Sequence, residues 1–277
     1  MNEFWACNDN KVKLQQFFIH WLKSTYHNEK QVYLGGSHEG NIYECHLLQH
    51  GVSQTVEELK CKHEEADERI QYHLNHLVCN NIHNILVSSG DTDVFVSLMF
   101  NFLSWRCKGL EELWVEHNGK ISSISQSVEA FPRDVVLLLP ALHSLTGCDV
   151  TSKVGTKDNA VKAAHEITHH NLLTFGVDEL NEEMIKSAES FLVASLPYNT
   201  KGMSTFDEVR HSQYHKTNIK DLSNFPCTSS SLRTHIKRAY LQTHVIIHAA
   251  TSSENISDET LYGYSRDEDG CIQNNSR

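Results

Sequence analysis

The chain has 277 residues, of which 39% are hydrophobic and 21% are charged. This balance is typical of a folded domain and is too apolar for a disordered chain. Lys and Arg number 24 against 35 Asp and Glu, so the formal net charge is −11. An acidic total disfavours proteins that coat nucleic acid or an anionic membrane by bulk charge, although it allows a local basic strip beside an acidic site.

Neither a membrane span nor a secretory signal is expected. The longest apolar run, from Val135 to Leu145, contains Pro140 and His143, and it is much shorter than the ~20 residues that cross a bilayer. The first residues lack a basic segment followed by an apolar one. The eight cysteines are scattered without a Cys-x-x-Cys pair, which is typical of reduced thiols. We therefore expect an intracellular protein, with the nucleus as one candidate compartment and no membrane partner.

Periodicity predicts the elements of the first part of the chain. Leu14, Phe17, Phe18, Trp21 and Leu22 recur at helical spacing and form one apolar face. The expected elements are a helix over about residues 11–26, extended segments around 32–34 and 42–48, and a helix over about 63–78.

A short apolar run at residues 84–90 predicts a buried parallel strand, because such strands carry apolar residues on both faces. Asp91 and Asp93 follow it, and Asp93 is expected to cap a helix over about 94–103. Asn118-Gly119 predicts a hairpin turn. The expected elements that follow are the hairpin strands 113–116 and 120–124, and helices over about 134–145, 157–170, 178–196 and 231–250.

Strands that alternate with helices predict an α/β fold with a largely parallel sheet flanked by helices, followed by a helical C-terminal region. The expected boundaries are a core over residues 1–170, a helical extension over 171–250 and a polar, disordered tail over 251–277. Ligands of such folds bind beyond the carboxyl ends of the strands. This rule indicates Asp91 and Asp93.

Three short segments carry carboxylates that are candidate metal ligands. They are Glu64-Glu65 at a helix start, Asp91 and Asp93 after a strand, and Asp149 after an apolar helix. Oxygen ligands suit Mg²⁺ or Mn²⁺, and two such ions can activate water and stabilise the leaving oxygen in phosphodiester cleavage. Each segment also has a plain structural interpretation, since acids favour helix starts, caps and turns.

The order of these motifs carries more weight than any one of them. Glu65-Ala66 precedes Asp91-Thr92-Asp93, then come Gly147-Cys148-Asp149 and a glycine turn with a helix at residues 154–162. Over about residues 62–164 this order resembles the flap-endonuclease and XPG-type branch of the PIN-like nucleases. The resemblance implies metal-dependent phosphodiester hydrolysis, with Glu65, Asp91, Asp93 and Asp149 as catalytic ligands of Mg²⁺ or Mn²⁺ and Glu64 as an auxiliary ligand.

The chain also resembles a group of animal proteins tied to mobile elements, through its His-Glu-Glu-Ala-Asp block, its Leu-Thr-Gly-Cys-Asp block and the helix over residues 231–240. It departs from the nuclease pattern in two places. His63 stands where the family has a second glutamate, and no aspartate before His63 matches the family's upstream strands. The core is therefore expected to lack its N-terminal strands. A second hypothesis follows, in which the domain binds nucleic acid or acts as a scaffold without turnover.

Two basic groups are candidate contacts to a nucleic-acid backbone, DNA in the first place, since phosphate contacts need local positive charge. A solvated helix face is the alternative for the second group. The candidates are Lys153, Gly155, Lys157 and Lys162 after the last acidic segment, and Arg233, Lys237 and Arg238 on the last helix.

One motif points to different chemistry. His165-Glu166-Ile167-Thr168-His169 matches the His-Glu-x-x-His pattern of zinc hydrolases, with Glu189 as a candidate third ligand. The chain contains 19 histidines, so a chance match to this short pattern is not rare. Lys162 and Asn171 also stand where a buried zinc helix is usually apolar. We treat this zinc site as a distant third hypothesis.

Overall fold

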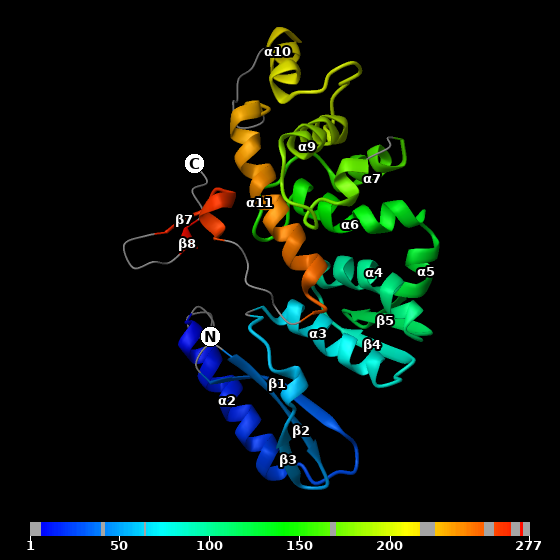
Figure 1. Ribbon diagram of the computed structural model, residues 1–277, viewed down its shortest axis with the longest axis vertical. Helices are drawn as coiled ribbons and strands as arrows, with labels where there is room; N and C mark the ends of the chain where they lie inside the picture. Colours follow the sequence, from blue (N-terminus) through cyan, green and yellow to red (C-terminus); the bar gives the residue numbers. More distant parts are fainter. Residues whose placement is uncertain are drawn as a thin grey trace. The chain divides into compact units, whose positions relative to one another are not determined.

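The computed structural model describes residues 7–39, 42–63, 65–166, 170–216, 225–251, 258–266 and 272–273. The chain divides into two compact units (Figure 1). Unit 1 comprises residues 1–81 and 249–254, and unit 2 comprises residues 82–248 and 255–277. This division differs from the expected core over residues 1–170, because the helix that follows Lys62 belongs to unit 1 and the chain returns to that unit after residue 248.

Unit 1 joins a small antiparallel sheet to helices. The sheet has the order β1-β2-β3, and a shift in register between Gly35 and Ser37 interrupts the β1–β2 pairing. Cys45 and Leu48 on the central strand are buried. The elements are α2 (Asn8–Thr25), β1 (Val32–Glu39), β2 (Ile42–Gln49), β3 (Val52–Thr55), η1 (Glu57–Leu59) and α3 (Ala66–Cys79).

Helix α2 was predicted from an apolar face that the structure only half buries. Among the described side chains of α2, Ile19 is the buried one, whereas Phe17, Phe18 and Trp21 are 62%, 49% and 50% exposed. The helix therefore forms where the period predicts it, but its aromatic side chains do not lie in a core.

Unit 2 contains a three-stranded sheet of order β4-β5-β6 and most of the helices (Figure 1). Strand β4 pairs with β5 in parallel, and β5 pairs with β6 in antiparallel fashion. The elements up to the tail are β4 (Asn84–Ser88), α4 (Thr92–Cys107), β5 (Glu112–His117), β6 (Lys120–Ser123), α5 (Ile124–Glu129), α6 (Arg133–Thr146), α7 (Lys157–Glu166), α8 (His170–Leu173), α9 (Glu182–Ser195), α10 (Phe206–Lys216) and α11 (Ser229–His248).

The α/β class is confirmed, but the sheets are small and mixed. Among the described strands only β4 and β5 run parallel. Strand β4 also buries one face alone, since Ile85 and Val87 are buried while Leu86 is 55% exposed. The hairpin predicted at Asn118-Gly119 is present, and both residues have the positive φ that its turn requires.

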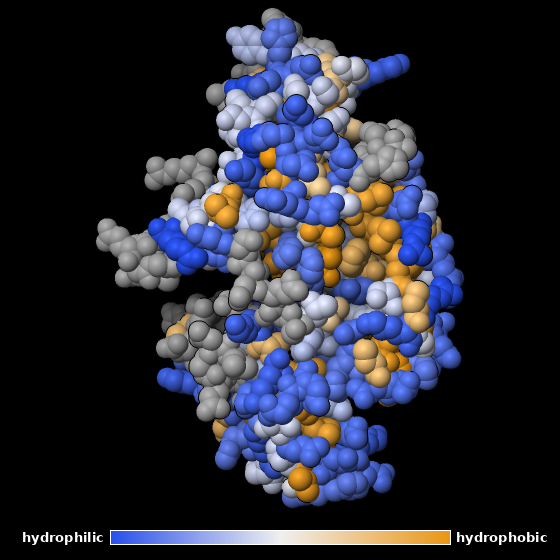
Figure 2. Space-filling view, viewed as in Figure 1, coloured by the Kyte–Doolittle hydropathy of each residue, from blue (hydrophilic) through white to orange (hydrophobic). Residues whose placement is uncertain are grey.

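The core of unit 2 is formed mainly by helices α6, α7, α9 and α11. Leu145, Ala188, Phe191 and Ala239 are at most 1% exposed. Half-buried residues such as Leu139 pack against this cluster, and Figure 2 shows hydrophobic residues gathered over α6 on one face. This core fixes the C-terminal end of α6.

Part of the segment expected to be a disordered tail is ordered. Residues Glu259–Tyr262 form a 3-10 helix, η3, and strands β7 (Ser265–Arg266) and β8 (Ile272–Gln273) pair with each other. The ring of Tyr262 stacks on that of Tyr240 in α11. No helix among the described residues is long and apolar enough to cross a membrane.

Candidate functional site

The turn between β4 and α4 holds Asp91 and Asp93 in different environments. Asp91 is the N-cap of α4, and one of its carboxylate oxygens accepts the backbone N–H of Asp93 at 2.8 Å. The helix starts at Thr92, so Asp91 caps it and Asp93 does not, contrary to the sequence prediction. Asp93 instead lies in the first turn, with its side chain only 13% exposed.

The C-terminal end of α6 and the loop after it bring in the second part of the site. Gly147 ends the helix with a φ of 109°, and a Cβ there would lie 2.7 Å from the Cα of Lys153. The loop closes on the helix because Val154 donates its N–H to the carbonyl of Thr146 at 3.1 Å. Thr151 braces it further by donating its hydroxyl to the carbonyl of Ser144 at 2.8 Å. Only glycine allows so tight a return.

Three side chains from three helices form a hydrogen-bonded line in this region. Nε2 of His143 on α6 lies 2.7 Å from Oδ1 of Asp93 on α4, and Nδ1 of His143 lies 2.9 Å from Nζ of Lys157 on α7. A protonated lysine can only donate, so Nδ1 is the acceptor. Nε2 then carries the proton and donates it to Asp93. The line therefore runs from an ammonium through a neutral imidazole to a carboxylate.

The electrostatics of this line favour the charged form of Asp93. The hydrogen bond from His143 is the largest cause that lowers the pKa of Asp93, and the charge of Lys157 adds to it against the opposing effect of burial. Lys157 is the first residue of α7. A cation is disfavoured at a helix N-terminus by about 0.3–1 kcal/mol. The contact with His143 and the charge of Asp93 offset this cost.

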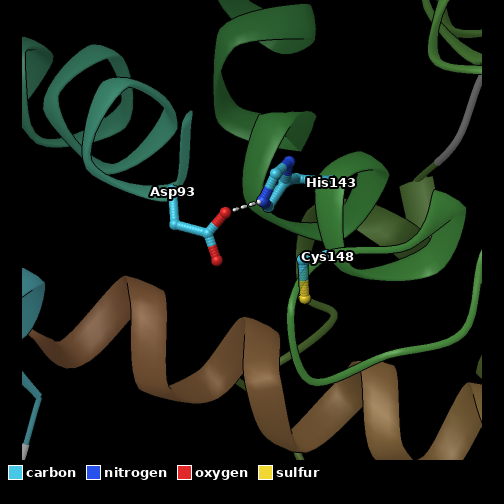
Figure 3. A group of neighbouring side chains, drawn as sticks. All are labelled: Asp93, His143 and Cys148. Atoms are coloured by element: carbon cyan, nitrogen blue, oxygen red, sulfur yellow. Dashed lines mark hydrogen bonds and ion pairs between the residues drawn. The ribbon is translucent and has the colours of Figure 1, made fainter. Parts of the chain in front are cut away.

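Cys148 completes a group of three metal-ligating side chains (Figure 3). One oxygen of Asp93, one nitrogen of His143 and the sulfur of Cys148 all lie within 4.8 Å of one another. Figure 3 shows Asp93 and His143 pointing toward each other from α4 and α6, with Cys148 on the loop beyond α6. The sulfur lies 3.2 Å from Oγ1 of Thr151, which holds it next to the other two groups.

These residues line a cleft of about 440 Å³ within unit 2. The cleft brings together five of the residues predicted from sequence, together with His143 and Cys148. The five are Asp93, Asp149, Lys153, Gly155 and Lys157.

Gly155 has a clear steric reason to be glycine. Its φ is +67°, and a Cβ there would lie 2.9 Å from the carbonyl oxygen of Ser195 in α9. Thr156 follows, and its hydroxyl accepts the N–H of Asn159 at 3.3 Å. The glycine lets the chain pass α9 closely, so that α7 begins at the edge of the cleft.

The other predicted acidic ligands are not among the residues that line this cleft. Asp91 is exposed and caps α4. Glu65 is the exposed N-cap of α3 in unit 1 and makes no side-chain cap hydrogen bond, and Glu64 lies outside the described residues. His63, at the position of the family's second glutamate, is buried and bonds to Glu68 and to the carbonyl of Thr251. The roles predicted for Glu64, Glu65 and Asp91 as ligands stay predictions.

The candidate basic residues differ in their surroundings. Lys153 and Lys157 line the cleft, and Lys162 is exposed farther along α7. Arg233 pairs with Glu182, and Lys237 is half-buried. Arg238 is only 6% exposed and donates twice to the carbonyl of Gly263. The last helix therefore does not present the continuous exposed strip that its sequence suggested.

The His-Glu-x-x-His motif is only partly described. His165 is exposed and its ring stacks on Phe131, whereas the side chain of Glu166 and all of His169 lie outside the described residues. Glu189 accepts hydrogen bonds from the N–H of Phe206 and the hydroxyl of Ser229. Its carboxylate therefore links α9 to the starts of α10 and α11.

Sequence reasoning missed His143 and Cys148 as site residues. His143 lies in the longest apolar run of the chain, where a single histidine on a buried helix face is unusual. Cys148 lies inside the Gly-x-Asp motif, between two residues that drew attention for other reasons. A histidine within an apolar helix was the signal that could have marked His143 as a site residue, although it does not indicate its partners.

Comparisons of the chain with protein-family models, with curated proteins and with solved structures give no match. The interpretation of the cleft therefore depends on its own chemistry.

Proposed function

We propose that the chain is a metal-dependent phosphodiester hydrolase that acts on nucleic acid, with its site in the cleft of unit 2. The observation that carries the proposal is the joint presence of Asp93, Asp149, Lys153 and Lys157 around one cleft. Carboxylates are the groups that hold a hard divalent cation, and lysines beside them would contact phosphate. The proposal includes a PIN-like ancestry for the β4–α4 region.

The donor set fits Mg²⁺ or Mn²⁺ in part. Asp93 is ionised more readily than an ordinary aspartate because His143 and Lys157 favour its charge. Asp149 is exposed at the same cleft and offers a second carboxylate. When bound, such an ion would supply a polarised water and a charge to balance the phosphate. Asp93 and Asp149 would hold it.

The chain's own residues have separable roles in this proposal. His143 fixes the carboxylate of Asp93 through the 2.7 Å hydrogen bond. Lys153 and Lys157 offer positive charge to the phosphate backbone. The first N–H groups of α7 lie beside Lys157, and a helix N-terminus favours anions. Together these groups would bind the backbone and orient it toward the two carboxylates.

The second candidate is a nucleic-acid-binding domain without turnover, and one observation favours it. Asp93 already accepts a hydrogen bond from His143, and one carboxylate oxygen of Asp91 already accepts the N–H that caps α4. If an ion cannot displace these contacts, the cleft would bind phosphate but would not cleave it. In both versions we propose that the protein acts inside the cell, where the free cysteines of the described chain stay reduced and nuclear DNA is one substrate.

The test is cleavage of a labelled DNA flap and a labelled single-stranded RNA in Mn²⁺, with the wild-type chain and an Asp149→Asn variant. The matched control is Asp134→Asn, which removes an exposed carboxylate in the first turn of α6, at the end of the helix opposite the cleft. We expect cleavage by the wild type and the control, and a loss of about a hundredfold or more in Asp149→Asn, because one ligand is removed. Binding of either substrate without cleavage by the wild type would favour the second candidate.

A further inference from the structure

The side chains of Asp93, His143 and Cys148 form a donor set of a different kind from the carboxylates discussed above. It offers one oxygen, one imidazole nitrogen and one sulfur, all within 4.8 Å of one another. Mg²⁺ and Mn²⁺ prefer oxygen, whereas a thiolate with an imidazole is typical of zinc sites. We propose that these three residues form a site for Zn²⁺ or a similar borderline transition ion, with the fourth position open to the cleft.

The position of each donor is fixed by the fold rather than by flexible surface segments. His143 is 5% exposed within the apolar part of α6, and Asp93 lies in the first turn of α4, which packs on α6. Cys148 is held by the Gly147 turn and by two contacts with the hydroxyl of Thr151, at 3.1 Å from its N–H and 3.2 Å from its sulfur. Ligands held in this way lose little entropy when they bind an ion.

The spacing requires only small shifts. A carboxylate oxygen and a ring nitrogen on one zinc ion lie about 3.4 Å apart, given zinc–ligand bonds of about 2.0–2.2 Å. Asp93 and His143 now lie 2.7 Å apart through a proton. Binding would replace that proton by the ion and draw in the sulfur of Cys148. The thiol proton of Cys148 would leave to solvent, and the ring proton of His143 would move from Nε2 to Nδ1, because cysteine binds as a thiolate and histidine as a neutral imidazole.

Lys157 places a positive charge beside the proposed ligands. Its ammonium lies 2.9 Å from Nδ1 of His143 and adds positive charge beside Asp93. Nε2 can bind an ion only if the ring proton moves to Nδ1, and an ammonium next to Nδ1 opposes that move. The lysine therefore acts as a competing cation, which an arriving ion must displace into the cleft.

This inference uses Asp93 in common with the proposed function but does not depend on hydrolysis. Its test measures binding alone, so that a protein that binds the ion without cleaving DNA still supports it. If the chain cleaves DNA in Mn²⁺ but fails the test below, the proposed function stands and this metal site is ruled out.

The experiment is a titration of the reduced, metal-free full chain with Co²⁺, which reports thiolate coordination as a charge-transfer band in the near ultraviolet. We expect the band in the wild type, its loss in Cys148→Ser, and its retention in Cys107→Ser, which removes an exposed thiol at the end of α4. Stoichiometric Zn²⁺ should abolish the band, and a large excess of Mg²⁺ should not. A wild type without the band, or a band that survives Cys148→Ser, would overturn the site.

A second pair of variants tests the role of Lys157 and does not remove a ligand. Lys157→Gln should raise the affinity for Co²⁺ about tenfold, because one competing charge near the site is removed. Lys153→Gln, at the same cleft but without the contact to His143, should change it less. Circular dichroism of each variant checks folding. Weaker binding by Lys157→Gln than by Lys153→Gln would overturn the assigned competition.

Discussion

The two units of the chain differ in how they use their aromatic residues. In unit 2, Trp105, Phe102, Phe175, Phe191 and Phe206 are among the largest fully buried side chains. In unit 1, the aromatic residues of α2 are about half exposed or more. Both units contain helices and a three-stranded sheet, so the difference lies in packing and not in the kind of element.

This difference in packing explains where the organised polar side chains lie. The line from Asp93 through His143 to Lys157 needs three helices held at fixed separations, and the core of α6, α7, α9 and α11 supplies that rigidity for two of them. Glu65 in unit 1 is an exposed residue at a helix start. Packing against a rigid core therefore distinguishes Asp93, which has fixed hydrogen-bond partners, from Glu65, which is exposed at a helix start.

The largest expected effect contrasts two phenylalanines. Phe191→Ala removes a side chain that is 1% exposed in the core of unit 2 and should lower the free energy of unfolding by about 3–5 kcal/mol. Phe17→Ala removes one that is 62% exposed in unit 1 and should change it by less than about 0.5 kcal/mol. Urea unfolding, monitored in each unit by hydrogen exchange, measures the two changes in the free energy of unfolding. Equal losses of stability in the two variants would contradict the contrast in packing.

The next effect is a pH dependence that His73 gives to unit 1. Burial, together with the charges of His76 and Arg69, lowers the pKa of His73 to about 4. Between pH 6.5 and 4 the unfolded chain therefore binds a proton that the folded chain does not, and the stability of unit 1 falls as the pH falls. The loss should reach at most about 3 kcal/mol at the acid end.

Hydrogen exchange of β1, β2 and α3 over this pH range tests the effect, with His73→Gln as the reference. The variant lacks the titrating group, so its exchange should depend less on pH than that of the wild type. The same pH dependence in both proteins would show that another group is responsible.

A smaller effect separates two N-cap residues. Asp91 accepts the N–H of Asp93 at the start of α4, whereas Glu65 makes no side-chain cap bond at the start of α3. Asp91→Ala should therefore destabilise unit 2 by about 1 kcal/mol, and Asp91→Asn should not, because asparagine also caps well. Glu65→Ala should leave the stability of unit 1 unchanged. Thermal unfolding of the three variants gives the comparison.

The smallest effect concerns binding of DNA by single basic residues. Lys153 lines the cleft, whereas Arg233 is paired with Glu182 on the surface. Lys153→Ala should reduce the salt dependence of DNA binding by about one ion, as the loss of one phosphate contact requires. Arg233→Ala should leave both that slope and the urea midpoint unchanged. A larger loss in Arg233→Ala would move the DNA-binding surface to α11.

Much of the fold could be predicted from local pattern. The strand at Asn84–Ser88, the hairpin at Asn118-Gly119 and the helix that ends at Thr146 all lie where periodicity and turn residues indicate. The order and direction of the paired strands could not be predicted this way, because strand pairing depends on residues far apart in the chain. β3 was missed since its four residues are all exposed and lack an alternating pattern.

The candidate site was predicted in part, for a similar reason. Asp93, Asp149 and Lys157 follow from motif order, and one cleft joins them. The contacts of His143 span 50 residues to Asp93 and 14 to Lys157, and no local pattern predicts a pairing at such distances. Local pattern also did not predict that Asp91 caps α4 or that Arg238 donates to the carbonyl of Gly263.

The central claim is that the carboxylate of Asp93 is the centre of a metal-binding cleft. The most direct test is calorimetric titration of Mn²⁺ into the wild type, Asp93→Asn and Asp91→Asn. The two variants lose the same charge two residues apart, and asparagine preserves the cap at position 91. We expect binding by the wild type and by Asp91→Asn, and none by Asp93→Asn. Binding that survives in Asp93→Asn, or is absent from the wild type, would contradict this claim.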